Sequence, residues 1–407
     1  MYGAHSTPDA VVPAHVPTHL VFDFNLNDDP RLRADLHDGL LALRQAAPGP
    51  IFFSPRNGGN WVVTGHQECH AIARNPQVFA NNPITVRPEL AQTPRIPVSI
   101  DPPDHAAYRR VLMEQLTPRA LARLEPDIHD TLNDLIDRVI ETGRCDFVPA
   151  VSEPLPVWVF MRMMGFPLER YKEFREWVGT LVQFLPPQVR QKTLDLVAEM
   201  SAPLIQERMA DRRDDLISRL IDADIDGRKP TFDEVISYCL MLFVAGLDTV
   251  VNAMSFGVRH LAMDQQLQAQ LREDPALIPD AIEELLRRYS FANPVRFVLQ
   301  DHDAFGVPLR RGDVVTLLLS AADLDERAFP APTRVELHRA TPHLAFNAGP
   351  HRCVGLHLAR MELRILYETW LRRMPTFRLD PDRPWRFHQG TVMGIESLPL
   401  VWDPPAR

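Results

Sequence analysis

The spacing of apolar residues along the chain is mostly that of α-helices. Apolar side chains recur every three or four residues in long stretches, and Pro, Gly, Ser or Thr stands near many of their ends. A stretch with this spacing can bury one face against a core, so each one predicts a helix. The predicted helices span residues 118–141, 168–184, 201–222, 231–263, 278–289 and 354–373.

Segments rich in β-branched and aromatic residues are few and short, which predicts small sheets. They span residues 51–54, 61–64, 296–300, 314–319 and 398–401. Asn57-Gly58-Gly59, between the first two, predicts a hairpin turn. No Gly/Ser linker, block of like charges or repeat interrupts the chain. We therefore expect one domain over residues 1–407, mainly α with small β-sheets at its margin.

Charge and cysteine content narrow the classes of function. The chain has 44 Lys and Arg against 53 Asp and Glu, a formal net charge of −9, so a chain-wide affinity for nucleic acid is not expected. Its four cysteines are scattered and too few for a disulfide scaffold or a zinc cluster, which favours a reducing compartment.

Two segments bear on the location of the protein. The N-terminal segment has neither a basic start nor a continuous apolar core, so it does not resemble a signal peptide. The most apolar segment, 238–258, carries Asp248, Thr249 and Asn252 in its middle, which a membrane span of roughly 20 residues rarely does. We expect a cytoplasmic protein with no membrane partner.

The most specific pattern in the chain surrounds its last cysteine. Residues 346–355 read Phe-Asn-Ala-Gly-Pro-His-Arg-Cys-Val-Gly, and a predicted helix follows. For this composition, chance would produce such a pattern with a frequency on the order of 10⁻⁵. The start of a helix favours a thiolate, which is the form of cysteine that binds a metal. Gly349 and Gly355 would let the backbone approach the sulfur and donate N–H groups to it.

A blander interpretation is that Cys353 is a buried thiol at a helix start, as a lone cysteine usually is. The surrounding pattern favours the metal ligand. Cys69, Cys145 and Cys239 stand in no such pattern, and we expect them to be packing residues.

The segment 346–355 resembles the haem-binding segment of the cytochrome P450 family. Other motifs of that family occur in the family's order from about residue 101 onward. The resemblance implies a single P450-type fold that binds haem b, with Cys353 as the axial ligand to the iron. It also implies that Phe346 shields the haem from water and that Gly349 forms part of the cofactor site.

The predicted helix 231–263 is interrupted by small and polar residues. Gly246 inside a helix costs about 1 kcal/mol relative to Ala, and a flat group lying against the backbone would account for it. Thr249 can donate a hydrogen bond to a carbonyl of the preceding turn and so open the helix locally. Taken alone, the stretch is better explained by a long core helix with a polar edge, and the cysteine motif is what favours the cofactor site.

Residues 245–249 resemble the oxygen-activation motif of the P450 family. This implies that Thr249 hydrogen-bonds dioxygen and that Asp248 controls proton delivery, a role that suits both side chains. Ala245 and Gly246 would border the haem. The haem would then lie between this helix and the helix that follows the cysteine loop.

Haem carries two propionate carboxylates, which need cationic partners when they are partly buried. The positions that match the family's propionate-binding residues are His105, Arg109, Arg296 and His351. Each of them alone would more often be a solvated surface charge. Together, at matched positions, they are expected to hold the propionates.

Glu284 and Arg287 lie one helical turn apart and can pair on one face of a helix. They match a buried pair that, in the family, holds the segment before the cysteine loop. The resemblance makes Arg334 the expected third member of this cluster. We expect all three residues to be structural.

The chain contains no flavin, nicotinamide or iron–sulfur motif, so its two electrons must come from a partner. We expect a [2Fe-2S] ferredoxin that is reduced by an NADH-dependent ferredoxin reductase. Arginines near the haem-facing motifs would form a basic docking patch, with some of them in internal ion pairs. These are Arg109, Arg110, Arg119, Arg352, Arg360 and Arg364.

Segments 246–252, 283–288 and 398–404 are similar to camphor 5-monooxygenase-like bacterial members of the family. The same resemblance nominates seven substrate-pocket residues: Ile84, Thr93, Val98, Met241, Val244, Val295 and Val392. Thr93 stands where the camphor-binding members have a tyrosine, which makes camphor a poor candidate. The mostly apolar set predicts a compact hydrophobic substrate, such as a terpenoid or a norisoprenoid ketone of the ionone type.

Two other functions use the same cysteine. One is a haem-based sensor or carrier without catalysis. The other is a peroxide-driven oxygenase or a haem-thiolate reductase that needs no ferredoxin. Asp248 and Thr249 favour a monooxygenase, because neither alternative needs a proton relay to activate dioxygen.

Overall fold

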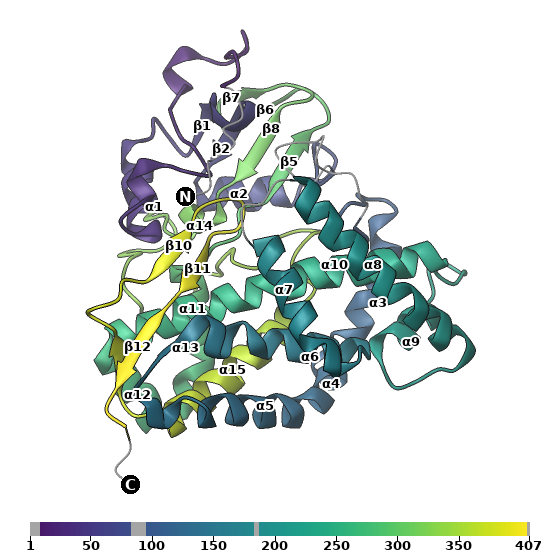
Figure 1. Cartoon of the computed structure of the whole chain (residues 1–407). Helices are drawn as coiled ribbons and strands as arrows, with labels where there is room; N and C mark the ends of the chain where they lie inside the picture. The colour runs from purple at the N-terminus through teal and green to yellow at the C-terminus, as the bar shows by residue number, and fades with distance from the viewer. Residues whose placement is uncertain (1–8, 83–94, 183–186, 405–407) are drawn as a thin grey trace.

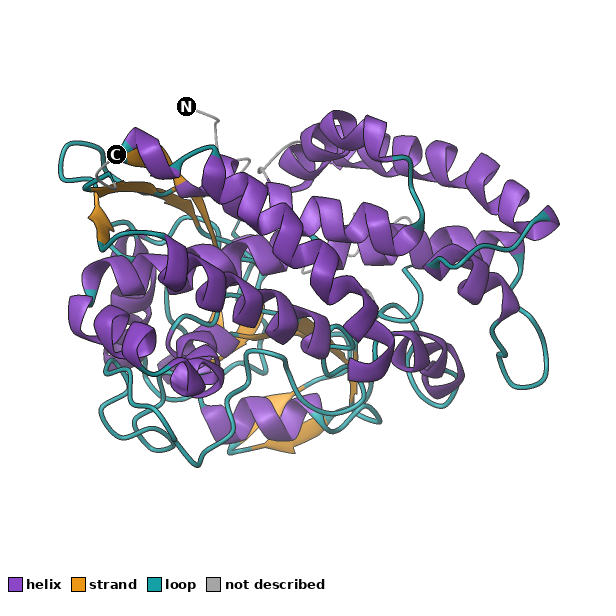
Figure 2. Cartoon of the chain, turned by 90° about the horizontal axis from the view of Figure 1, so that it is seen from below, coloured by secondary structure: helices purple, strands orange, loops and turns teal. Residues whose placement is uncertain are grey.

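The computed structural model describes residues 9–82, 95–182 and 187–404. Helices form most of the molecule, and strands lie at its margins (Figures 1 and 2), as expected for a mainly α fold with small sheets. The helices are α1 (Leu36–Ala46), α2 (His66–Ala73), α3 (His105–Gln115), α4 (Pro118–Leu121), α5 (Glu125–Asp137), α6 (Pro154–Met164), α7 (Tyr171–Val182), α8 (Pro187–Ala210), α9 (Leu216–Asp222), α10 (Phe232–Gly246), α11 (Asp248–Met263), α12 (Gln265–Glu273), α13 (Ile278–Arg288), α14 (Leu319–Ala322) and α15 (Leu356–Arg373).

The largest sheet joins strands of residues 51–80 to strands of residues 295–317, with strand order β1-β2-β8-β5-β3. Its β1–β2 hairpin turns at Asn57, which has a positive φ of 58°, where the sequence predicts a turn. A second sheet has the order β4-β12-β9, and β6–β7 and β10–β11 form separate pairs. The strands are β1 (Ile51–Ser54), β2 (Asn60–Val63), β3 (Phe79–Ala80), β4 (Arg144–Asp146), β5 (Val295–Val298), β6 (His302–Ala304), β7 (Val307–Leu309), β8 (Val314–Leu317), β9 (Phe377–Leu379), β10 (Arg386–His388), β11 (Gly394–Ser397) and β12 (Pro399–Trp402).

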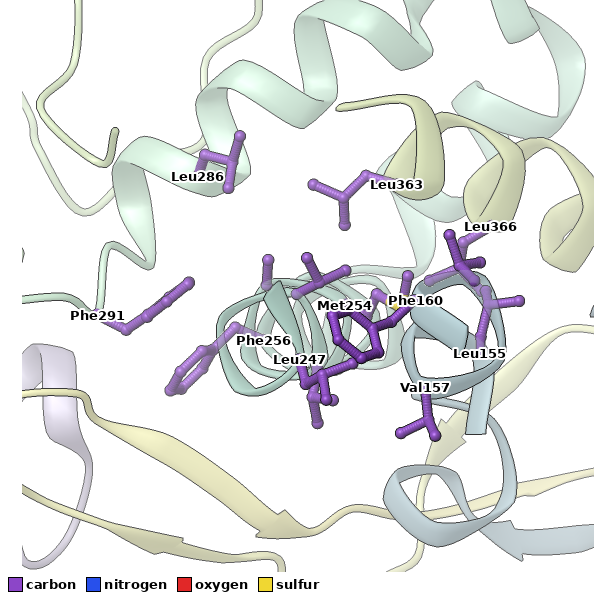
Figure 3. Packing of buried hydrophobic residues seen from close by; sticks show 14 of the residues in the cluster. Leu155, Val157, Phe160, Leu247, Met254, Phe256, Leu286, Phe291, Leu363 and Leu366 are labelled. Carbon is purple, nitrogen blue, oxygen red and sulfur yellow. The ribbon is translucent and has the colours of Figure 1, made fainter. Parts of the chain in front are cut away.

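Helices α10 and α11 run through the middle of the molecule. Thr231 caps α10 with a hydrogen bond from the Glu234 N–H, and Glu234 caps the Thr231 N–H in return. Figure 3 shows α11, with Met254 and Phe256 labelled, packed among side chains of α6, α13 and α15. The stretch predicted as one helix is therefore two core helices that meet at Leu247.

Among the described helices, only Phe232–Met263 is long and apolar enough to cross a membrane. More than half of its most apolar window is buried inside the fold. A buried core helix has the same composition as a membrane span, because both surround their side chains with apolar groups.

The prediction of one continuous helix over residues 201–222 is wrong. Helix α8 begins at Pro187, continues through Pro203 and ends at Ala210. Asp215 then caps the separate helix α9 by accepting a hydrogen bond from the Ser218 N–H at 2.8 Å. The chain therefore turns between the two helices, where apolar spacing alone suggests continuity.

Candidate functional site

The cysteine loop packs closely against α2. Gly349 has a φ of 69°, and a Cβ on it would lie 2.2 Å from the carbonyl oxygen of Ala73. The Cys353 N–H donates to the Phe346 carbonyl at 2.9 Å, which closes the loop just before α15. Contact with α2 and a positive φ therefore each favour glycine at position 349.

Cys353 differs from the other cysteines in its surroundings. Its side chain is accessible, whereas Cys69 and Cys239 are fully buried and Cys145 is partly buried. Burial within the fold raises the pKa of Cys353, but a backbone hydrogen bond from Gly355 and the charges of Arg109, Arg360 and Arg352 lower it. Burial has the larger effect, so the pKa of Cys353 is raised overall, and the N–H group and the three cations would stabilise the thiolate once a metal is bound.

The predicted propionate-binding residues come together from separate parts of the chain. The rings of His105, at the start of α3, and His351, in the cysteine loop, lie 4.3 Å apart. His351 Nε2 lies 3.1 Å from Asp101 Oδ1. Arg109 donates to the Arg352 carbonyl, and Arg296 from β5 donates through Nη1 to Asn81 Oδ1 at 2.6 Å.

This cluster has buried donors that the chain does not satisfy. Arg296 is 1% exposed, and its Nη2 has no hydrogen-bond partner in the described structure. The same is true of His105 Nε2. Burial lowers the pKa of Arg296 to about 10 and that of His105 to about 4, with His351 and Arg109 lowering the latter further. The desolvated cation of Arg296, with a donor that has no acceptor in the described structure, and the neutral ring of His105 fit a site built for anionic oxygens, such as haem propionates.

The junction of α10 and α11 is opened by Thr249. Its Oγ1 donates to the Ala245 carbonyl at 2.8 Å, which confirms the predicted bond to the preceding turn. A Cβ on Gly246 would meet no protein atom within 4 Å, so packing inside the chain does not require glycine there. Ala245, Gly246, Asp248 and Thr249 are all partly accessible, although Leu247 between them is buried.

Asp248 is held by a residue to which the sequence assigned no function. Asn252 Nδ2 donates to Asp248 Oδ1 at 2.9 Å, and Asn252 Oδ1 accepts from the Ile395 N–H at 3.2 Å. Asn252 is 1% exposed. In the sequence it is visible only as a polar residue in an apolar stretch, because its second partner lies 143 positions away.

The helices that carry these groups are in contact. Tyr238 of α10 donates to the Tyr108 carbonyl of α3 at 2.8 Å. Gly257 of α11 packs against Tyr367 of α15, whose hydroxyl would clash with any Cβ at that position. These contacts join α10 to α3 and α11 to α15, the helix that follows the cysteine loop.

Comparisons with known proteins identify the family. The pattern of the cytochrome P450 family matches residues 150–397. A probable cytochrome P450 127A1 of Sinorhizobium fredii is 33% identical over an alignment of 406 positions, which covers 96% of this chain and 97% of that protein. The chain belongs to the cytochrome P450 family.

Other relatives agree. A steroid C26-monooxygenase of Mycobacterium tuberculosis is 34% identical over 394 residues, 91% of this chain and 97% of the relative. The crystal structure of CYP101J2 superimposes with a TM-score of 0.90 at 32% identity, covering 97% of this chain and 100% of that one. The protein is thus a cytochrome P450 monooxygenase, and its family membership implies a haem b cofactor, a hydrophobic substrate and redox partners.

The P450 substrate-pocket candidates are only partly described. Val98, Met241, Val244 and Val392 are partly accessible, as residues bordering a binding site are. Val295 is 2% exposed and forms part of β5, so it packs inside the sheet. Ile84 and Thr93 lie outside the described residues.

The buried Glu284 cluster has a different third member from the one expected. Arg287 donates to both Glu284 oxygens at 2.8 Å, and Arg339 Nε donates to Glu284 Oε1 at 2.8 Å. Arg334 contributes only its carbonyl, which accepts from Arg287 Nη2 at 3.1 Å. The assignment of Arg334 as the third charged member is therefore wrong, and Arg339 takes that place.

Three of the six arginines in the predicted basic patch form ion pairs with carboxylates. Arg360 pairs with Glu283 through two bonds of 2.6 Å. Burial raises the pKa of Glu283, but the hydrogen bonds and charges of Arg360 and His343 outweigh burial and lower this pKa to about 2. Arg364 pairs with Glu125 and Glu368, and Arg110 with Asp226. In the described part of the chain no carboxylate pairs with the other three: Arg109, Arg119 and Arg352.

Proposed function

We propose that Cys353 binds the haem iron and that the enzyme hydroxylates a compact hydrophobic substrate. The two electrons would come from a [2Fe-2S] ferredoxin reduced by an NADH-dependent reductase. The overall reaction converts substrate, dioxygen, NADH and a proton into the hydroxylated product, water and NAD⁺. The observation that carries the proposal is the accessible Cys353 thiol, supported by the Gly355 N–H and lying beside a cluster of desolvated cations.

Each group of residues then has a chemical task. Bound haem supplies the activation of dioxygen. Cys353 holds it on one side, and His105, Arg109, Arg296 and His351 neutralise its propionates. On the α10–α11 side, Thr249 presents a hydroxyl at the opened turn, where it can pass on a proton.

Asp248 replenishes the proton that Thr249 passes on, since it is the adjacent acid at the same opened turn. Apolar side chains of Met241 and Val244 exclude water from the substrate side. We further propose that residues 1–407 work as one cytoplasmic domain, which is supported by the coverage of the Sinorhizobium relative.

The role of Cys353 is tested by its spectrum. Cys353→Ser should abolish the thiolate-type spectrum of the reduced carbon monoxide complex, while Cys145→Ser, a change at a partly buried cysteine outside the motif, should preserve it. An unchanged spectrum in Cys353→Ser would refute the ligand assignment. Thr249→Ala should keep haem and substrate binding but divert electrons from product to peroxide, measured as product formed per NADH consumed.

The substrate class is the less constrained part of the proposal. Similar proteins are named steroid C26-monooxygenase and methyl-branched lipid omega-hydroxylase, so hydrophobic substrates of several sizes occur among the relatives. The mostly apolar pocket candidates, with few polar anchors, support a small terpenoid or norisoprenoid ketone such as an ionone.

Titrating the oxidised enzyme with ionones, monoterpenes, a steroid and a branched fatty acid tests this class. The small compounds should produce the low- to high-spin shift. If only the steroid or the fatty acid did so, the substrate proposal would be wrong and the monooxygenase would stand.

The ferredoxin proposal is supported by the accessible arginines beside the cysteine loop. Arg352→Glu should raise the ferredoxin concentration needed for half-maximal rate several-fold at low salt, and the effect should shrink as salt rises. Arg372→Glu, at the far end of α15, is the matched charge reversal and should change little. Equal effects of the two variants would argue against this docking surface.

A further inference from the structure

We infer that Asn252 is a positioning residue that fixes the orientation of Asp248 and links it to strand β11. The inference rests on the proposed role of Asp248 in proton delivery. Asn252 lies one helical turn after Asp248 and donates to its Oδ1 at 2.9 Å. Its own oxygen accepts from the Ile395 N–H at 3.2 Å, so the side chain bridges α11 and the strand.

The bridge determines which way the amide of Asn252 points. A backbone N–H can only donate, so the group facing Ile395 must be the oxygen of Asn252. The NH₂ group must therefore face Asp248, where it donates to Oδ1. Asn252 therefore holds Oδ1 of the acid at a defined place beside strand β11.

The contact with β11 is close and specific. A Cβ on Gly394 would lie 2.4 Å from Asn252 Oδ1, so only glycine lets the strand approach the amide at this position. Asn252 is almost fully buried, so water does not replace either of its bonds. A larger residue at position 394 would push the strand from α11 and break the link.

The same strand follows the turn that carries a substrate-pocket candidate. Val392 is bridged to Ala292, and the backbone N–H of Met393 donates to the Phe291 carbonyl at 2.9 Å. Only Met393 and Gly394 separate Val392 from Ile395. A displacement of this turn by substrate is therefore transmitted through one amide side chain to the acid that delivers protons. The link makes proton delivery sensitive to what occupies the pocket.

Two variants of Asn252 test the inference. Asn252→Leu has a similar volume and neither hydrogen bond, and it should lower product formed per NADH by about tenfold, the effect of losing one hydrogen bond to a charged group. Its solvent isotope effect on turnover should rise, because proton transfer becomes rate-limiting. Haem content and the substrate-induced spin shift should stay as in the wild type.

Asn252→Asp keeps the size and the bond from Ile395 but cannot donate to Asp248 while it is ionised. When protonated, it can donate again. Its activity relative to wild type should therefore recover as the pH falls, which a purely structural defect would not do. This isosteric variant also keeps the test informative if the leucine variant fails to fold.

Ser255→Ala is the matched control. Ser255 is fully buried on α11 and bonds Val251 and Ser152, without contact to Asp248 in any recorded bond. Its loss should leave the coupling of NADH to product and the isotope effect unchanged. If Ser255→Ala and Asn252→Leu behave alike, the effect comes from helix packing and the inference is wrong.

A double-mutant cycle with Asp248→Asn separates the two proposals. If Asp248→Asn itself leaves coupling and the isotope effect unchanged, the proposed role of Asp248 fails. A second outcome is that Asp248→Asn greatly lowers coupling and that Asn252→Leu lowers it further by its full single-variant effect. In that case the proposed role of Asp248 is supported and the Asn252 inference is wrong. We expect Asn252→Leu to add little in the Asp248→Asn background.

Discussion

Two buried arginines in this molecule differ in how many of their hydrogen-bond donors have a partner. Arg287 and Arg296 are each 1% exposed. Arg287 donates to both oxygens of Glu284 and to three backbone carbonyls. Arg296 uses Nη1 for Asn81 and its neighbouring carbonyl, and its Nη2 has no acceptor in the described chain. The first is satisfied by the fold, whereas the second keeps a donor that a bound propionate would satisfy under the proposed function.

This difference separates structure from binding among residues of the same type. A buried charge is retained at a cost, and the chain offsets that cost for Arg287 with its own carboxylate and carbonyls. For Arg296 the nearest acid, Asp101, only partly offsets the desolvation, and the pKa of Arg296 stays lowered to about 10. The two arginines have the same charge and the same burial. The donor without an acceptor is therefore what distinguishes the arginine that we expect to bind a ligand.

The largest effect should follow loss of the acid that satisfies Arg287. Glu284→Gln leaves Arg287 and Arg339 buried without a carboxylate and should destabilise the holoenzyme by about 3–5 kcal/mol. Urea unfolding followed by tryptophan fluorescence measures this. Glu368→Gln, which removes a partner of the more exposed Arg364, should cost less than about 1 kcal/mol. Similar losses in both variants would contradict the buried-pair account.

Arg296→Leu should affect binding more than folding. Removing a cation that the chain does not fully satisfy costs the fold little, but a propionate loses a charged donor worth about 1.5–3 kcal/mol. Haem should therefore leave about ten- to a hundredfold faster, as measured by transfer to a scavenging protein.

In urea, Arg296→Leu should lose haem absorbance before tryptophan fluorescence changes. In Glu284→Gln the two transitions should coincide. Coincident transitions in Arg296→Leu would show that Arg296 is structural after all.

The sequence indicated which residues belong to these clusters better than it indicated which hydrogen bonds they form. The cysteine motif nominated Cys353 and His351 because local spacing carries that information, and the helix break was visible at Gly246 and Thr249. The side-chain bond from Thr249 to the Ala245 carbonyl was predicted, but the division into two helices at Leu247 was not.

Long-range partners were invisible for a related reason. Asn252 binds Ile395 across 143 positions, and no local pattern encodes such a contact. The end of α8 was missed because Asp215 both caps α9 and accepts from the buried Arg208 at 2.5 Å, so a tertiary ion pair sets the boundary. Apolar spacing reports which face is buried, but not what lies against it.

A third buried basic group, His37, remains neutral in the folded protein. It therefore avoids the free-energy cost of burying a charge. Burial, with Arg288 adding to it, lowers the pKa of His37 from 6.5 to about 3. Between these values the unfolded chain binds a proton that the folded chain does not, so stability should fall as the pH drops from 6.5 toward 3.

The loss attributable to His37 should be at most about 1.4 kcal/mol per pH unit. His37→Phe, which preserves ring packing against Phe256 and Tyr289, should flatten this part of the stability profile. Urea unfolding at pH 7, 6 and 5 measures the slope. An identical slope in both proteins would show that His37 is not the responsible group.

The last prediction compares Arg334, the expected third member of the Glu284 cluster, with Arg339, the observed one. Arg339→Ala removes a side chain that binds Glu284, and it should cost about 1–3 kcal/mol because the acid is buried. Arg334→Ala keeps the carbonyl that accepts from Arg287, so it should cost less than about 0.5 kcal/mol. A larger loss in Arg334→Ala would restore the prediction made from the sequence. Because position 334 acts through its backbone, only substitutions that move that backbone, such as Arg334→Pro, should reach the cluster.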